Sequence, residues 1–145
     1  MKFFSSAVIA SLLLIPQLVF ATPVEGLLGR WKSQDVLYGD GVQFRIDFNF
    51  TPTKTTMNVN CFFTMGQRLR ASATASTTYD VNNIFIREQK ENVSGDGQHF
   101  CRASLYPAQW TAYFNGAGAM VLFVPTPYQA QFHLVPVTPA IAPLL

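Results

Sequence analysis

The stretch Val42-Gln43-Phe44-Arg45-Ile46-Asp47-Phe48-Asn49-Phe50 decides the fold class of this chain. Every even-numbered position in it is apolar, and every odd-numbered position after Val42 is polar or charged. Because successive side chains of a β-strand point to opposite faces, this alternation predicts a strand with one buried and one solvated face. A helix would instead spread the same apolar side chains around its whole surface.

Similar short segments, separated by turn residues, fill most of the remaining chain. They predict strands at 27–38, 42–50, 55–65, 69–79, 84–89, 99–105, 110–114, 119–124 and, as a short last one, 129–135. Residues 90–98 are predicted to form a polar loop, and the tail from about residue 138 is predicted to be irregular because it holds two prolines. Short strands at regular spacing indicate an antiparallel meander.

The predicted fold is therefore all-β: an antiparallel meander of about eight strands closed into a barrel, with a two-layer β-sandwich as the alternative. Closure removes the unpaired edges that an open sheet would leave. Antiparallel pairing that keeps apolar side chains together predicts several neighbouring pairs, among them Phe48 with Val59, Tyr79 with Ile84, Leu105 with Trp110, and Ala112 with Val121.

Cys61 and Cys101 are the two cysteines of the chain. An even number of cysteines in an exported protein predicts a disulfide between them. They fall on the third and sixth predicted strands, which are not neighbours in a meander, whereas a disulfide needs Cα atoms within about 7 Å of each other. Three explanations stay open: the barrel is flattened, the bond forms where a loop folds over, or both thiols are free.

Residues 1–21 have the pattern of a secretory signal peptide. Lys2 supplies the positive start, a mostly apolar run follows, and Val19-Phe20-Ala21 suits cleavage after Ala21. A membrane anchor is disfavoured because the run is short for a spanning helix and contains Pro16. We therefore expect one β-barrel domain, residues 22–145, in the periplasm or outside the cell.

The charge of that domain is close to neutral. Loss of Lys2 with the signal peptide reduces the formal charge from +2 to +1. Nucleic-acid binding and polybasic membrane surfaces both need clustered Lys and Arg. We therefore expect no nucleic-acid partner and no integral membrane association.

The segment Leu28-Gly29-Arg30-Trp31 resembles the Gly-x-Trp signature of lipocalins and other calycin barrels. It also resembles the openings of avidin-type barrels and of some small bacterial protease inhibitors. The stretch from Cys61 through 71–73 and 84–86 to 101–105 is similar to uncharacterised bacterial lipocalin-like proteins. The resemblance implies a lipocalin-like barrel closed at one end by Trp31. The chain departs from lipocalins in having no Arg after the last strand and no visible C-terminal helix.

The first functional hypothesis is a non-enzymatic binding protein that holds a small apolar ligand inside the barrel. Inward-facing alanines leave room beside aromatic walls, which gives these candidate ligand-binding residues: Trp31, Phe44, Phe48, Phe63, Ala73, Ala103 and Phe114. A solid core of the same residues is the alternative. The second hypothesis is a protein-binding or protease-inhibitor-like module that uses rim loops such as 90–98 and 125–128.

Catalysis has no motif in this sequence. No Gly-x-Ser-x-Gly nucleophile elbow is present. The required residue types are supplied by His99, His133, Ser104, Asp35, Asp47, Glu88, Glu91 and Asp96. The two histidines also lack the spacing of metal ligands. We therefore assign no catalytic residue and expect no metal, no cofactor and no enzymatic activity.

Overall fold

The computed structural model describes residues 22–39, 41–125 and 129–137. The signal peptide predicted at 1–21 and the tail predicted from residue 138 lie outside these residues and stay predictions. The described chain contains eleven strands: β1 (Gly29–Ser33), β2 (Leu37–Gly39), β3 (Val42–Phe50), β4 (Lys54–Phe62), β5 (Arg68–Asp80), β6 (Asn83–Ile86), β7 (Lys90–Gly95), β8 (Phe100–Leu105), β9 (Ala108–Phe114), β10 (Met120–Val124) and β11 (Ala130–Pro136). Within the described residues, no helix is long and apolar enough to cross a membrane.

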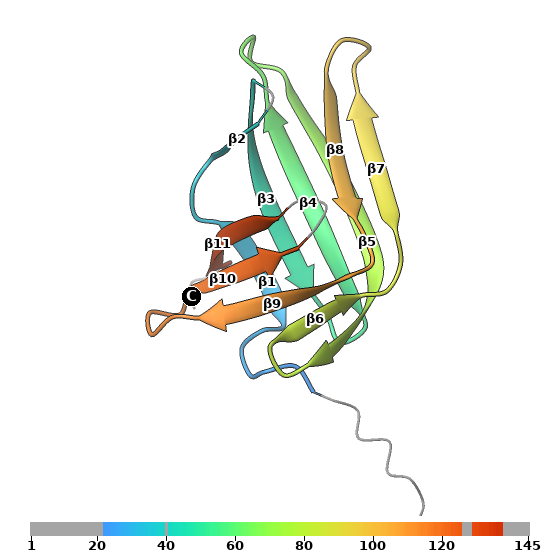
Figure 1. The fold of residues 1–145 in the computed structure, drawn as a ribbon. Coiled ribbons are helices and arrows are strands. Elements are labelled where there is room, and N and C mark those ends of the chain that lie inside the picture. The colour runs from blue at the N-terminus through green and yellow to red at the C-terminus, as the bar shows by residue number, and fades with distance from the viewer. Residues whose placement is uncertain (1–21, 40, 126–128, 138–145) are drawn as a thin grey trace, which may run out of the picture.

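Eight antiparallel strands close into a barrel (Figure 1). The ring runs β1-β11-β10-β9-β6-β5-β4-β3, and β3 pairs with β1 to complete it. Strand β2 lies outside the ring and pairs with the first half of β3, where Leu37 is opposite Phe44. The predicted all-β class and closed barrel are confirmed, and the two-layer sandwich is not the architecture.

The β7–β8 hairpin is the main departure from the predicted meander. Residues 90–98 were expected to form a loop, but Lys90–Gly95 is a strand that pairs with β8 in a separate two-stranded sheet. Nearly every residue of β7 is exposed, so its sequence lacks an alternating apolar pattern. The predicted pairing of Leu105 with Trp110 is therefore wrong: Leu105 is opposite Lys90, and Trp110 is opposite Ile84.

This hairpin lies against β5, as Figure 1 shows. Strand β6 pairs only with Thr77–Asp80, which leaves the first part of β5 without a backbone partner on that side. The side-chain amide of Asn92 donates a hydrogen bond of 3.0 Å to the backbone carbonyl of Ser72 on this edge. The hairpin therefore covers an edge that would otherwise be open to another chain.

A disulfide between Cys61 of β4 and Cys101 of β8 fixes the hairpin to the barrel. Their Cα atoms are 5.9 Å apart although β4 and β8 share no backbone ladder. Of the three explanations left open by the sequence, the folded-over segment is the right one. The inward side chains of Ala71 and Ala73 on β5 are small and buried, which allows β8 to lie close to that strand.

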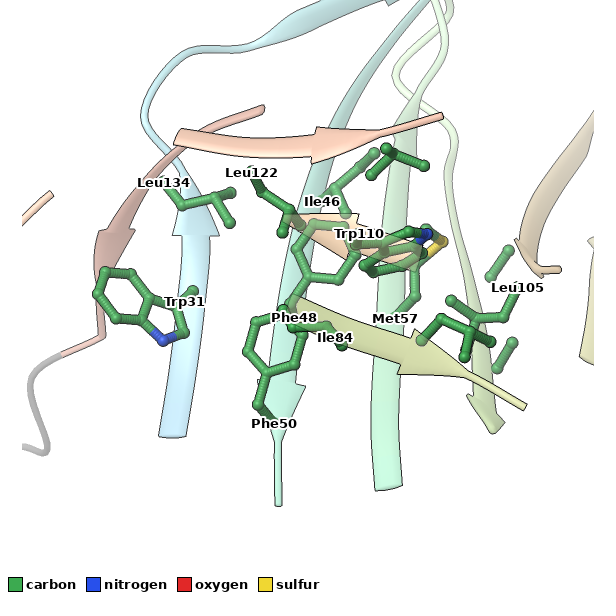
Figure 2. Packing of buried hydrophobic residues seen from close by; sticks show 14 of the residues in the cluster. Trp31, Ile46, Phe48, Phe50, Met57, Ile84, Leu105, Trp110, Leu122 and Leu134 are labelled. Atoms are coloured by element: carbon green, nitrogen blue, oxygen red, sulfur yellow. The ribbon is translucent and has the colours of Figure 1, made fainter. Parts of the chain in front are cut away.

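The core is centred on Phe48 (Figure 2). Its ring lies 5.6 Å from that of Trp110 and 5.7 Å from that of Phe132, edge to face in both cases. It also stacks 5.9 Å from Phe50, its neighbour on the same face of β3. Such contacts add to the free energy gained by burying the aromatic area.

The strand registers agree with the predicted faces more often than with the predicted partners. Tyr79 is opposite Ile84, as predicted. Phe48 is opposite Met57 and not Val59, a slip of two residues that keeps every side chain on its face. Ala112 is opposite Leu122 and not Val121, so the prediction there assigned the wrong residue of β10 to the core.

Candidate functional site

A groove at one end of the barrel is lined by residues from three turns. These turns lie at the top of Figure 1. The turns join β2 to β3, β4 to β5, and β7 to β8. The groove has a volume of about 410 Å³. We call it the loop-end groove, and its lining residues are Gly41, Val42, Phe63, Thr64, Met65, Gln98, His99 and Phe100.

The walls of the loop-end groove combine apolar side chains with the polar side chains of Thr64, Gln98 and His99. Val42 and Phe63 are half-buried against the core, whereas Met65 is 83% exposed and Phe100 is 65% exposed. Exposed apolar side chains that lie together, as these two do in one groove, often mark contact sites. The groove thus includes an apolar surface that continues from the core to the solvent.

Phe100 is held in place by a glycine opposite it. Gly95 is its cross-strand partner, and a Cβ atom on Gly95 would lie 2.8 Å from the Phe100 ring. The ring therefore lies directly over the Gly95 backbone, a space that any other residue would fill. This contact positions an otherwise exposed ring at the mouth of the groove.

His99 supplies a fixed polar group beside these apolar side chains. Its ring lies 4.5 Å from that of Phe63, and its Nδ1 is 3.1 Å from Oδ2 of Asp96. Oδ1 of Asp96 accepts hydrogen bonds from the backbone N–H groups of Gln98 and His99, at 2.9 and 2.7 Å. These bonds lower the pKa of Asp96 to about 2, so its carboxylate stays charged at neutral pH and orients the imidazole.

Of the ligand-binding residues predicted from the sequence, Trp31, Phe48, Ala73 and Ala103 belong to the buried core. Phe48 and Ala103 are 0% exposed, and Ala73 and Trp31 are buried at 5% and 4%. A side chain with no accessible surface borders no space as wide as a water molecule. Of the others, Phe63 lines the loop-end groove and Phe44 packs half-buried against the core.

Trp31 and Phe114 form a separate contact, with ring centroids 5.9 Å apart. The Trp31 indole N–H donates a hydrogen bond of 2.9 Å to the backbone carbonyl of Leu27. Gly29, two residues earlier, has a φ of +126°, which a residue with a side chain rarely adopts. The Gly-x-Trp segment thus turns the chain into β1 and places the indole in the core.

Of the residues considered for catalysis, His99 lies beside Asp96. His133 is exposed on β11, and Asp47 is half-buried on β3 with its side chain on the outward face. The Ser104 hydroxyl is buried and has no hydrogen-bond partner among the residues that the structure describes. Among the described residues, no group of three or more His, Cys, Asp or Glu side chains is placed to hold a metal ion.

Sequence reasoning missed most of the loop-end groove. Consecutive turns of a meander alternate between the two ends of the sheet, so counting strands indicates which turns meet. Interpreting 90–98 as a loop removed one strand from that count and hid the meeting of Gln98–Phe100 with the turn at Phe63–Met65. A second hollow of about 360 Å³ lies between β9, β10 and β11. Residues 126–128 of the predicted rim loop 125–128 lie outside the described part of the chain.

Comparison with family models, with curated proteins and with solved structures finds no match to this chain. The eight-stranded closed barrel is compatible with a lipocalin-like fold. The functional argument therefore rests on the geometry of the barrel and of its loop end.

Proposed function

We propose that this protein is an exported, non-enzymatic binding protein of lipocalin-like type that holds a small apolar ligand in the loop-end groove. The supporting observation is the groove itself: about 410 Å³, with the apolar side chains of Val42, Phe63, Met65 and Phe100 beside one oriented imidazole. Small-molecule sites are typically apolar hollows of about 300–1,000 Å³ with a few placed polar groups. The ring nitrogen of His99 that does not face Asp96 serves as the polar group that orients the ligand.

Export is part of the same proposal. The pattern of residues 1–21 is that of a signal peptide, and the Cys61–Cys101 disulfide suits an oxidising compartment. The mature protein is expected in the periplasm or outside the cell.

The binding test uses the full exported chain. Native mass spectrometry of the purified protein is expected to give extra mass that disappears on denaturation. Titration with an apolar fluorescent dye is expected to give saturable binding to the emptied protein. A double variant, Met65→Glu with Phe100→Glu, is expected to lose this binding because both charges would stand at the mouth of the groove.

The matched control places the same two charges on exposed apolar positions away from the groove. Val93→Glu with Phe123→Glu is suitable, since both side chains are exposed, at 42% and 38%, and neither lines the loop-end groove. Wild-type affinity in the control and loss in the groove variant support the proposal. Equal affinity in both double variants contradicts it.

A protein partner is the second candidate, and the high exposure of Met65 and Phe100 favours it. Aromatic and methionine side chains are enriched in the centres of protein interfaces. In that case the groove variant loses a protein partner in pull-down experiments, while the wild-type protein shows no bound mass and no saturable dye binding.

A further inference from the structure

The outward face of β1, β3, β4 and β5 gathers most of the cationic side chains of the described chain. Side chains of paired residues stand on the same face, so the register defines rows across the sheet. One row is Arg45–Asn60–Arg70, and the row next to it is Tyr38–Gln43–Phe62–Arg68, which begins on β2. The two following rows begin with Lys32 and Arg30 of β1.

We call this surface the basic outer face and define it by Arg30, Lys32, Arg45, Arg68 and Arg70 with the polar residues between them. All five cations are exposed. The ion pairs of the described residues are Lys90–Glu88, His99–Asp96 and Arg102–Glu91, and none involves these five. Asp47 is the one carboxylate in the four rows, so the face carries unbalanced positive charge.

Short hydrogen-bonding side chains fill the space between the cations. Asn58 accepts hydrogen bonds through Oδ1 from the Arg70 guanidinium at 3.2 Å and from the Ser72 hydroxyl at 2.8 Å. The hydroxyls of Thr56 and Thr74 are 2.9 Å apart. These contacts hold the side chains in an ordered polar array that needs little rearrangement on binding.

Two aromatic rings, those of Tyr38 and Phe62, lie in the row that contains Arg68, at one edge of the basic outer face. Tyr38 is 74% exposed, and the Arg68 guanidinium lies over the Phe62 ring, 5.5 Å from its centroid. An exposed ring gives an apolar platform for the C–H face of a sugar, and guanidinium groups pair with carboxylate or sulfate in two-point contacts.

From this arrangement we propose that the basic outer face binds an acidic polysaccharide. The choice of an acidic polysaccharide as the ligand rests on the proposed export, because such polymers are found in the periplasm and outside the cell. A second copy of the chain is disfavoured because two such faces repel each other. A membrane surface is disfavoured because stable attachment needs an apolar insertion beside the charges, and the inner rows have none.

The test measures retention of the full exported chain on immobilised dextran sulfate, polygalacturonate and neutral dextran. Retention on both acidic polymers, released by salt, and none on neutral dextran is expected. Arg45→Gln with Arg70→Gln is expected to weaken affinity about ten-fold for each arginine lost, since a hydrogen bond to a charged group contributes roughly that factor.

The matched control, Lys90→Gln with Arg102→Gln, removes the same charge from the β7–β8 hairpin. It is expected to keep the wild-type affinity. Equal weakening in both double variants would show that net charge alone drives retention and would overturn the proposal. So would tighter binding to anionic phospholipid vesicles or to single-stranded DNA than to the two acidic polymers, or no retention at low salt. Dye binding in the loop-end groove is measured separately from polysaccharide retention. Failure of the proposed ligand binding is therefore distinguishable from failure of the proposed polysaccharide binding.

Discussion

Cys101 of β8 is bonded to Cys61 of β4, and its sulfur also lies 3.5 Å from the backbone carbonyl oxygen of Val59. This link joins two elements that share no backbone ladder, the barrel and the β7–β8 hairpin. Because the hairpin carries Gln98, His99 and Phe100, the bond also holds one wall of the loop-end groove.

Replacing both cysteines by alanine is expected to lower the free energy of unfolding by about 4 kcal/mol, since the bond closes a loop of some forty residues. Chemical denaturation of the variant and the wild type measures this difference. Dye affinity is expected to fall as well, because the hairpin wall is no longer fixed. Unchanged stability and unchanged binding would contradict the role given to the bond.

Phe48→Ala removes the ring around which the core packs. We expect a loss of about 3–5 kcal/mol in the free energy of unfolding, because the cavity left among Phe50, Trp110 and Phe132 cannot collapse fully. Urea denaturation measures this loss in the free energy of unfolding. Phe123→Ala, which truncates a ring on the outer surface, serves as the control, and a loss of similar size there would count against a core centred on Phe48.

Ser104→Ala is expected to leave the stability unchanged or raise it by about 1 kcal/mol, because the buried hydroxyl has no hydrogen-bond partner in the described part of the chain. Thr77→Val provides the contrast. The Thr77 hydroxyl donates to Thr55 at 2.8 Å and lies 3.1 Å from the Ala75 carbonyl, so its removal is expected to cost about 1–2 kcal/mol. Thermal unfolding of both variants measures these changes in stability. A loss of stability in Ser104→Ala as large as that in Thr77→Val would contradict this prediction.

Tyr79 is expected to make the protein sensitive to alkaline pH. Burial raises its pKa from 10.0 to about 12, and its hydroxyl donates a hydrogen bond of 2.7 Å to the backbone carbonyl of Thr51. A pKa raised by folding gives stability that is fully present below about pH 10 and is lost as the pH rises towards 12. The unfolding free energy measured between pH 9 and 12 should fall by about 2 kcal/mol more in the wild type than in Tyr79→Phe. If the unfolding free energy falls equally with pH in the wild type and in Tyr79→Phe, the alkaline sensitivity does not come from Tyr79.

The parts of the fold that the sequence predicts are the strands with one face buried in the core and the other exposed to solvent. Val42–Phe50 and the Tyr79–Ile84 turn belong to this class, because burial of one face imposes period-two alternation. Alternation does not fix partners, since a slip of two residues keeps each face intact, and Phe48 accordingly faces Met57 rather than Val59.

Strand β7 shows why the rest was missed. It is exposed along almost its whole length, so hydrophobicity along Lys90–Gly95 carries no strand signal. Its pairing with β8 is supported by the disulfide and by the contact of Asn92 with β5, which act across distant parts of the chain. The basic outer face was missed for a related reason: total charge is visible in a sequence, whereas the rows that gather Arg45, Arg68 and Arg70 exist only once the register is set.

The most direct test of the binding account is amide NMR mapping on the isotope-labelled exported chain during titration with an apolar dye. The account predicts chemical-shift changes concentrated at Val42, Phe63–Met65 and Gln98–Phe100, with small changes at Phe48, Ala103 and Trp110. Large changes at these three core residues, with little change at the loop end, would place the ligand inside the barrel and contradict the assignment of the loop-end groove.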